Sequence, residues 1–248
     1  MRPGNRIWAW AFVLAAAISH PVSAGPPFIT DDPEPTDTGH FENYLYVQGT
    51  RAAGQTSGPA EGGEINYGAF PDTQLTVSIP LDFNPGPGSM GMLFAPVGLG
   101  MKYRFIQEDG EGWRPQVAFF PQVQIPVGSA SRNIPTTEFL PLWAQKSFGR
   151  WTAFGGSGFT VNPGAGNRNF FLFGGVLLRQ VGDRLQLGAE MFGQTRGSIS
   201  SGGSAAVGLG ALYDLTDNWH LIGSVNTGIV DARENDTYSY IFAVKWTI

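Results

Sequence analysis

Apolar and polar residues alternate along most of the chain beyond residue 40. Leu75, Val77 and Ile79 alternate with Gln74 and Thr76, and similar runs continue to the last residues of the chain. Successive side chains of a β-strand point to opposite faces, so a period of two predicts strands with one apolar and one polar face.

Twelve segments carry this pattern, and several of them exceed the roughly ten residues with which a tilted strand crosses a bilayer. The segments are residues 41–51, 62–70, 73–83, 97–107, 113–127, 136–148, 150–161, 169–181, 184–195, 204–214, 218–228 and 237–248. Tryptophans near the ends of these segments suit the aromatic girdles of a membrane barrel. They are Trp113, Trp143, Trp151, Trp219 and Trp246.

The connections between the segments alternate between short and long. The short ones are residues 71–72, 108–112, 149, 182–183 and 215–217. The long ones are 52–61, 84–96, 128–135, 162–168, 196–203 and 229–236. An even number of strands with short periplasmic turns and long outer loops predicts an all-β, antiparallel up-and-down transmembrane barrel over residues 41–248.

A soluble sandwich or propeller is the alternative to a barrel. Either needs a mixed, charged exterior, whereas the polar faces here consist of Gly, Gln, Ser, Thr and few charges. A propeller also needs a repeat of about 40 residues, which the chain lacks. The alternation therefore favours the membrane barrel.

The N-terminus predicts export. Arg2 and Arg6 precede an apolar run from Ile7 to Ser19, and Val22-Ser23-Ala24 is a small-residue cleavage site. This is the pattern of a cleavable signal peptide over residues 1–24. A membrane anchor is the alternative, but it needs about 20 apolar residues. Together with the barrel pattern, the signal predicts the outer membrane of a Gram-negative bacterium.

Composition removes several classes of function. The chain has no Cys, only 14% charged residues and a net charge of −5. A disulfide scaffold, a cysteine-ligated metal and a Cys nucleophile are excluded, and the absence of a basic run argues against nucleic acid. No cofactor motif or metal-ligand spacing is present. The expected partners are outer-membrane lipid, the outer-membrane assembly machinery and a small-molecule permeant, while the pattern makes no prediction of oligomeric state.

The stretch Gly25–Pro35, GPPFITDDPEP, followed by Gly39-His40-Phe41-Glu42, resembles the start of a bacterial family called the MetA-pathway of phenol degradation, or transporter, family. Residues 98–105, GLGMKYRF, are similar to a strand of that family. The resemblance covers most of residues 25–248, in the later strands by pattern more than by identity. It implies an outer-membrane barrel for the passage of small, often hydrophobic or aromatic compounds.

Charged side chains on the polar faces are candidates for the periplasmic mouth and the lumen. They are Lys102, Arg104, Arg114, Lys146, Glu190, His220 and Lys245. One interpretation is that the basic members pair with acids of the periplasmic turns. These acids are Asp72, Glu108, Asp109, Glu111 and Asp183.

The segment before the first strand, residues 25–40, is acidic and rich in proline. Asp31, Asp32, Glu34 and Asp37 would lie beside the basic mouth, so the segment is a candidate plug across the periplasmic opening. A disordered acidic leader is the alternative.

Three inward aromatic residues, Phe120, Phe154 and Phe192, would narrow a twelve-stranded lumen or give hydrophobic permeants an apolar path. An outer-membrane lipid hydrolase is the rival class. His220 and Ser224 are about 13 Å apart along one strand, which is too far for direct proton transfer, although a serine on a neighbouring strand, Ser204 or Ser239, stays open. The sequence favours a channel for small molecules, a structural barrel with a closed lumen being the remaining alternative.

Overall fold

The computed structural model describes residues 28–52, 55–83, 92–94, 96–127, 135–232 and 238–248. The predicted signal peptide, residues 1–24, lies outside the described residues. In the described part, no helix is long and apolar enough to cross a membrane.

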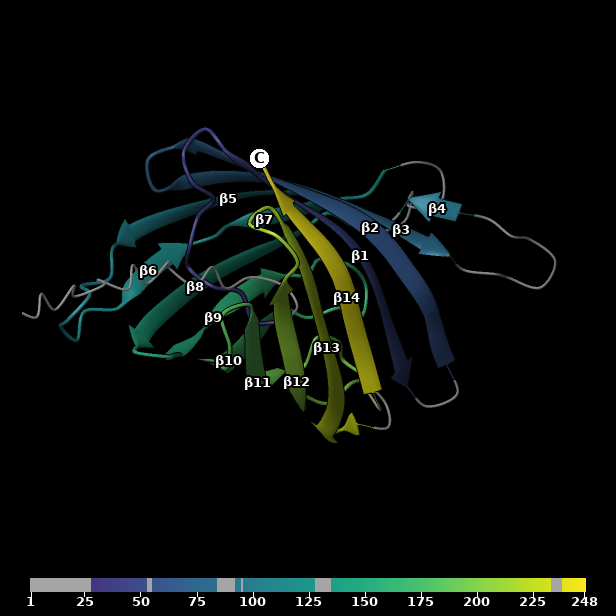
Figure 1. Ribbon diagram of the computed structural model, residues 1–248. Helices are drawn as coiled ribbons and strands as arrows, with labels where there is room; N and C mark the ends of the chain where they lie inside the picture. The colour runs from purple at the N-terminus through teal and green to yellow at the C-terminus, as the bar shows by residue number, and fades with distance from the viewer. Residues whose placement is uncertain (1–27, 53–54, 84–91, 95, 128–134, 233–237) are drawn as a thin grey trace, which may run out of the picture.

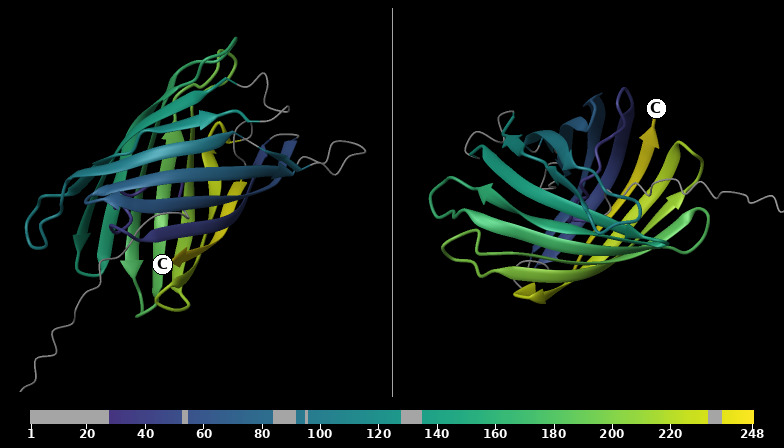
Figure 2. Two further views of the ribbon diagram at one scale, coloured as in Figure 1. Left: turned by 90° about the horizontal axis from the view of Figure 1, so that it is seen from above. Right: turned by 90° about the vertical axis from the view of Figure 1, so that its left-hand side faces the viewer.

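The chain folds into a closed antiparallel barrel of twelve strands (Figures 1 and 2). The strands are β1 Phe41–Ala52, β2 Gln55–Phe70, β3 Thr73–Phe83, β4 Met92–Phe94, β5 Val97–Ile106, β6 Gln116–Phe119, β7 Gln122–Ile125, β8 Thr137–Phe148, β9 Trp151–Val161, β10 Phe170–Gln180, β11 Leu185–Gln194, β12 Ser204–Asp214, β13 Trp219–Val230 and β14 Tyr238–Thr247. The twelve barrel positions pair in chain order, and β1 pairs with β14 to close the barrel. β4 and β5 occupy one barrel position beside β3, and β6 and β7 occupy another between β5 and β8.

The strand predicted over residues 113–127 is shorter and is interrupted. β6 begins at Gln116, and the ladder breaks at Phe120-Pro121, since Pro121 has no N–H to donate. The carbonyl of Pro121 still accepts from Met101 N at 3.1 Å, and Phe120 N donates to Pro141 O at 3.1 Å. The same register therefore continues across the break, and Phe120 keeps its inward position.

The prediction that short and long connections alternate without exception is wrong. β1 and β2 extend through most of the predicted loop 52–61, so that only residues 53–54 separate them. Backbone pairing of Arg51 with Thr56 continues the ladder to the end of the barrel. The Gly- and Ser-rich composition of this stretch did not prevent strand pairing.

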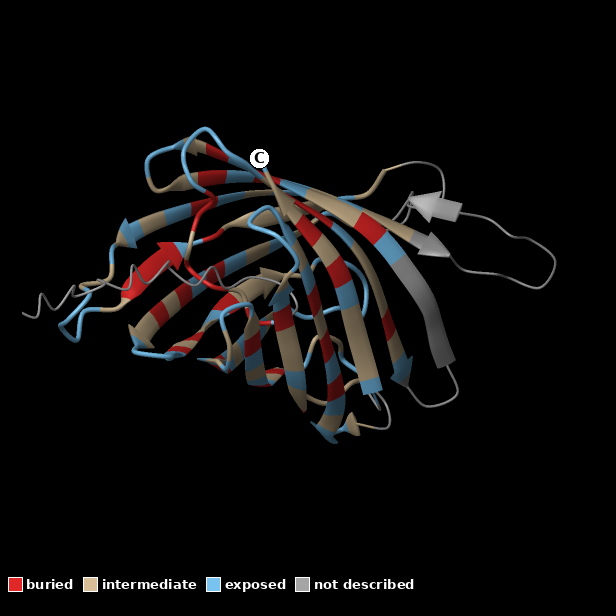
Figure 3. Cartoon of the chain, viewed as in Figure 1, coloured by how far each residue is buried: buried red, intermediate tan, exposed pale blue. Residues whose placement is uncertain are grey.

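The outer face of the barrel is apolar, whereas the inner face carries most of the buried polar side chains together with a patch of apolar ones. On β3, outward Leu75 is 45% exposed and inward Gln74 is 4% exposed. Figure 3 shows the alternation of buried and exposed residues along the strands. An outer belt of exposed Leu, Ile, Val, Phe and Met side chains suits contact with lipid.

Trp143 departs from the predicted aromatic girdle, because its side chain points into the barrel and is 1% exposed. Two of the remaining tryptophans, Trp219 and Trp246, stack with ring centroids 5.8 Å apart at the end of the barrel that carries the short turns. We call this end the turn end. The chain enters β1 and leaves β14 there, since Phe41 and Ile248 exchange backbone hydrogen bonds.

Candidate functional site

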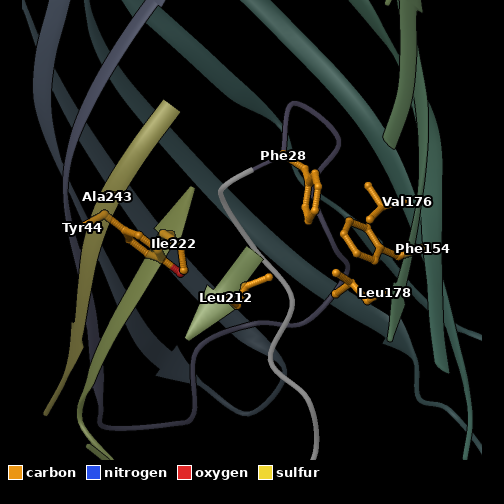
Figure 4. Packing of buried hydrophobic residues seen from close by; sticks show 8 residues of the cluster. All are labelled: Phe28, Tyr44, Phe154, Val176, Leu178, Leu212, Ile222 and Ala243. Atoms are coloured by element: carbon orange, nitrogen blue, oxygen red, sulfur yellow. The ribbon is translucent and has the colours of Figure 1, made fainter. Parts of the chain in front are cut away.

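Residues 28–38, which we call the N-terminal segment, lie inside the barrel. Phe28 is 7% exposed and belongs to a buried cluster with residues of β1, β9, β10, β12, β13 and β14. The other members are Tyr44, Phe154, Val176, Leu178, Leu212, Ile222 and Ala243. Figure 4 shows Phe28 facing Phe154, Val176 and Leu178, and the Phe28 and Phe154 rings meet edge to face with centroids 6.2 Å apart.

Glycines on three neighbouring strands make room for the start of the N-terminal segment. A Cβ atom on Gly188 of β11 or Gly210 of β12 would come within 2.8 Å of the Phe28 ring. A Cβ atom on Gly174 of β10 would overlap the Thr30 hydroxyl. These inward glycines form a cradle whose shape fits the segment, because larger side chains would occupy its place.

Glu190 on β11 binds the backbone of the same part of the segment. Its carboxylate accepts hydrogen bonds from Thr30 N at 2.6 Å and from Ile29 N at 3.2 Å. The glutamate predicted as a lumen residue thus holds the N-terminal segment. Among the described residues, no strand pairs with the backbone N–H groups of Ile29 and Thr30, so Glu190 is their acceptor.

The acidic part of the segment meets Lys102 of β5. Lys102 Nζ lies 3.2 Å from Asp31 Oδ1 and 3.7 Å from Asp32 Oδ1, and it donates to Glu34 O at 3.4 Å. The ammonium group also lies 5.0 Å from the centre of the Phe120 ring. A single buried lysine thus contacts the carboxylates of Asp31 and Asp32 and the backbone carbonyl of Glu34.

The last residues of the segment are held by polar groups of β2 and β3. Gln74 Oε1 accepts hydrogen bonds from Thr36 N at 2.8 Å and Thr36 Oγ1 at 3.0 Å. Thr38 forms a parallel bridge with Gly68 of β2. A Cβ atom at position 68 would overlap the backbone of Asp37, so the close approach requires glycine there. The chain then turns into β1.

Burial raises the pKa of two carboxyl groups of the segment. Desolvation raises the pKa of Asp32 well above its usual range, although nearby Lys102 opposes this effect. Desolvation also raises the pKa of Glu34, against the opposing charges of Arg104 and Lys102. Both groups therefore hold a proton more readily while the segment is docked than they would in water.

The other basic candidates have partners at the turn end. Arg104 points inward and contacts Asp72 at 2.6 Å and Gln116 at 2.9 Å. Lys245 points inward and contacts Glu42 at 2.7 Å. These two ion pairs lie within the wall, and the charge of Arg104 also acts on Glu34 of the segment.

Two of the predicted inward residues lie elsewhere. Arg114 is exposed in the connection before β6, because the strand begins three residues later than predicted. Lys146 shares the outward face of β8 with Leu142 and Phe148, since the adjacent Gln145 points inward. Lys146 forms ion pairs with the turn acids Glu108 at 3.1 Å and Asp109 at 3.2 Å. These pairs compensate the charge of an outward lysine at this edge of the barrel. Asp37, the last acid of the segment, is exposed.

His220 is part of a pair at the turn end. Its Nδ1 lies 2.6 Å from Asp214 Oδ1, and Lys245 is its register partner on β14. Ser239 lies opposite Asn226, and Ser204 opposite Gln194, so neither serine is the register neighbour of His220. The arrangement lacks a described nucleophile beside the imidazole.

The three inward aromatic residues do different things. Phe154 is buried against Phe28, Phe120 is buried beside Lys102, and Phe192 is half-buried next to Gly174. Two of them therefore contact the N-terminal segment or its lysine partner.

A cavity of about 220 Å³ remains between the N-terminal segment and the wall formed by β1, β2, β3, β5 and β8. Its charged lining consists of Asp31, Asp32, Glu34, Glu42, Glu64 and Lys102. Its aromatic lining consists of Phe28, Tyr44, Phe120, Phe139 and Trp143. In the described part of the chain, no group of three His, Asp or Glu side chains is placed to hold a metal ion.

No family model matches the chain, and neither does any curated protein. Solved structures do match. An outer-membrane channel from Pseudomonas putida F1 superposes with a TM-score of 0.68 at 10% identity, over 88% of this chain and 98% of that one. The chain has the fold of an outer-membrane porin. The KdgM and NanC porins superpose on this barrel with TM-scores of 0.55 and 0.53, each at 10% identity and over 98% of its own chain, and over 84% and 82% of this chain.

Proposed function

We propose that this protein is a channel of the outer membrane through which small molecules pass passively, and that residues 28–38 form a constriction in its lumen. The observation that carries the proposal is a piece of the protein's own chain inside a closed barrel, held there by noncovalent contacts. The ion pairs with Lys102 and the hydrogen bonds to Gln74 and Glu190 are contacts that can break and re-form.

The proposed orientation has the turn end in the periplasm, because short turns face that side in bacterial barrels. The constriction then lies at the periplasmic side, where the segment joins β1. Small hydrophobic or aromatic permeants are the proposed cargo. The inward rings of Phe120, Phe139 and Trp143 support this choice, as does the resemblance at residues 25–42.

The test removes residues 25–40 and keeps Phe41, whose backbone bonds to Ile248 belong to the barrel. Single-channel conductance of the deleted and full-length proteins is measured in planar bilayers. We expect a clear increase in conductance on deletion, because the segment fills part of the lumen. Heat-dependent mobility on SDS gels of the outer-membrane fraction shows whether each barrel is closed.

Two outcomes would count against the proposal. An intact barrel whose conductance does not change on deletion would reject the constriction. A deleted barrel that conducts no ions and does not admit aromatic solutes into liposomes would favour a structural barrel with a closed lumen.

A further inference from the structure

We infer that the cavity between the N-terminal segment and the wall binds a small aromatic ammonium ion. The inference rests on the proposed channel function, because it names a ligand class for the lumen of that channel. Three features of the cavity lead to it: an excess of carboxylates, two buried polar atoms without partners, and an aromatic lining.

Carboxylates outnumber the cations that face them. Five acids line the cavity, while Lys102 is the cation in the lining and Lys245 contacts one of the acids, Glu42, from outside it. Glu64 accepts a hydrogen bond from Asn66 at 2.9 Å, and no cation is seen within ion-pair distance of it among the described residues. A further cation in the cavity would offset this negative charge.

Two buried polar atoms of the lining lack partners among the described residues. Asp32 Oδ2 accepts no hydrogen bond, although the residue is 1% exposed. Trp143 Nε1 donates none, and this residue is equally buried. Such atoms are costly unless something binds them. A ligand would satisfy both atoms if it donated a hydrogen bond to Asp32 Oδ2, as an ammonium group does, and accepted one from Trp143 Nε1.

Aromatic rings favour an organic cation over a bare metal ion. Phe28, Phe120 and Phe139 line the cavity together with Trp143, and the rings of Phe139 and Trp143 meet edge to face at 6.3 Å. Ring faces attract ammonium groups and pack against other rings. Lys102 already lies 5.0 Å from the centre of the Phe120 ring, so this lining accommodates an ammonium group.

The size of the cavity limits the ligand. Its volume of about 220 Å³ is below the roughly 300–1,000 Å³ typical of sites for drug-sized ligands. A single ring with a short aminoalkyl chain suits this space. A hydroxyl group on the ring would supply the acceptor that Trp143 lacks.

The test uses tyramine, which has an ammonium group at one end and a phenol hydroxyl at the other. Binding to the purified, full-length barrel in detergent is measured by isothermal titration calorimetry. The comparison ligands are 4-ethylphenol, which is neutral, and 4-hydroxyphenylacetate, which is an anion. We expect saturable binding of one tyramine, with both comparison ligands at least about tenfold weaker, since only tyramine carries the charge that the carboxylates select.

Three variants and one control locate the site. Glu64→Gln keeps the acceptor for Asn66 and should weaken tyramine binding by about tenfold. Asp32→Asn removes the other carboxylate and should weaken binding similarly. Asp217→Asn, which changes an exposed acid in the turn after β12, should leave the affinity unchanged. Trp143→Phe should reduce the affinity for tyramine but not that for phenethylamine, which has no hydroxyl.

Equal binding of 4-ethylphenol and tyramine would overturn the inference, because the site would then be merely apolar. Unchanged affinity in both Glu64→Gln and Asp32→Asn would overturn it as well, provided that the heat-dependent gel shift shows closed barrels. Conductance measured on the same samples separates the two proposals. A conducting barrel that does not bind tyramine defeats this inference alone, whereas tyramine binding to a barrel that never conducts defeats the channel function.

Discussion

The two ends of the N-terminal segment are held in different ways. Phe28 and Thr30 lie on the wall formed by β9 to β12, where apolar side chains and glycines fit their shape. Asp31 to Thr38 lie against β2, β3 and β5, where Lys102 and Gln74 supply charge and hydrogen bonds. The first end is held by packing and by the hydrogen bonds that Ile29 N and Thr30 N donate to Glu190, and the second by ion pairs and hydrogen bonds without such packing.

This difference decides which end responds to conditions. Contacts between apolar groups change little with salt or pH, whereas ion pairs weaken with salt, and a buried carboxyl group with a raised pKa is held less strongly as the pH rises. We therefore expect the acidic end to be released first, and the Phe28 end to remain as the anchor of the constriction.

The largest effect of a single substitution is expected for Phe28→Ala. Truncating a buried Phe costs about 3–5 kcal/mol. Here the substitution weakens docking of the segment, because the Phe28 ring packs against the barrel wall. Conductance in planar bilayers should rise towards that of the 25–40 deletion. Phe171→Ala, which changes an exposed outward ring, is the matched control and should conduct like the unaltered protein. An unchanged Phe28→Ala conductance would mean that packing is not the anchor.

A smaller effect is expected for Lys102→Met. Hydrogen bonds to charged groups contribute about 1.5–3 kcal/mol, and the substitution removes those to Asp31 and Glu34. Conductance should rise less than in Phe28→Ala, and its dependence on salt should become weaker. Lys245→Met removes another inward lysine, which pairs with Glu42 of β1. Lys245→Met is therefore the control. Equal changes in conductance for the two lysine variants would contradict the conclusion that Lys102 holds the acidic end of the segment.

The smallest effect is expected from pH. Asp32 has a raised pKa while docked, so docking takes up a proton and is strongest below the ordinary value of about 3.9. Docking weakens as the pH rises through the raised value. The groups that face Asp32 are Asp31, Glu34, Glu42, Glu64 and Lys102. Lys102 keeps Asp31 as a partner when Asp32 is protonated.

Single-channel recordings should therefore show lower conductance at about pH 5 than at about pH 7.5. Asp32→Asn is always neutral and should flatten this dependence. A conductance that rises on acidification would contradict the sign derived from the burial of Asp32.

Most of the barrel was predictable from the sequence, because the alternation of apolar and polar residues that marks a strand depends only on neighbouring residues. The bounds of β3 and β12 follow directly from their alternation. The break at Phe120-Pro121 and the late start of β6 were missed, although Pro115 and Pro121 were visible signals. The girdle prediction for Trp143 rests on an aromatic residue near a strand end, whereas its shared parity with Gln145 places it inside.

The site was predictable only in part. The acids of the segment and the parity of Lys102 pointed to the turn end, but no local pattern tells which acid a lysine will meet across a barrel. Phe28 and the glycine cradle were not identified. Their relation depends on three strands more than 140 residues later in the chain, and it exists only once the barrel has closed.

The seam between β1 and β14 closes the wall around the N-terminal segment. Glu42 to Arg51 pair with residues 238–247, and Phe41 exchanges bonds of 2.7 and 3.0 Å with Ile248, the last residue. The segment leads directly into the first strand of this seam. The segment before β1 is therefore enclosed by strands that follow it in the chain, and the β1–β14 seam completes the wall around it.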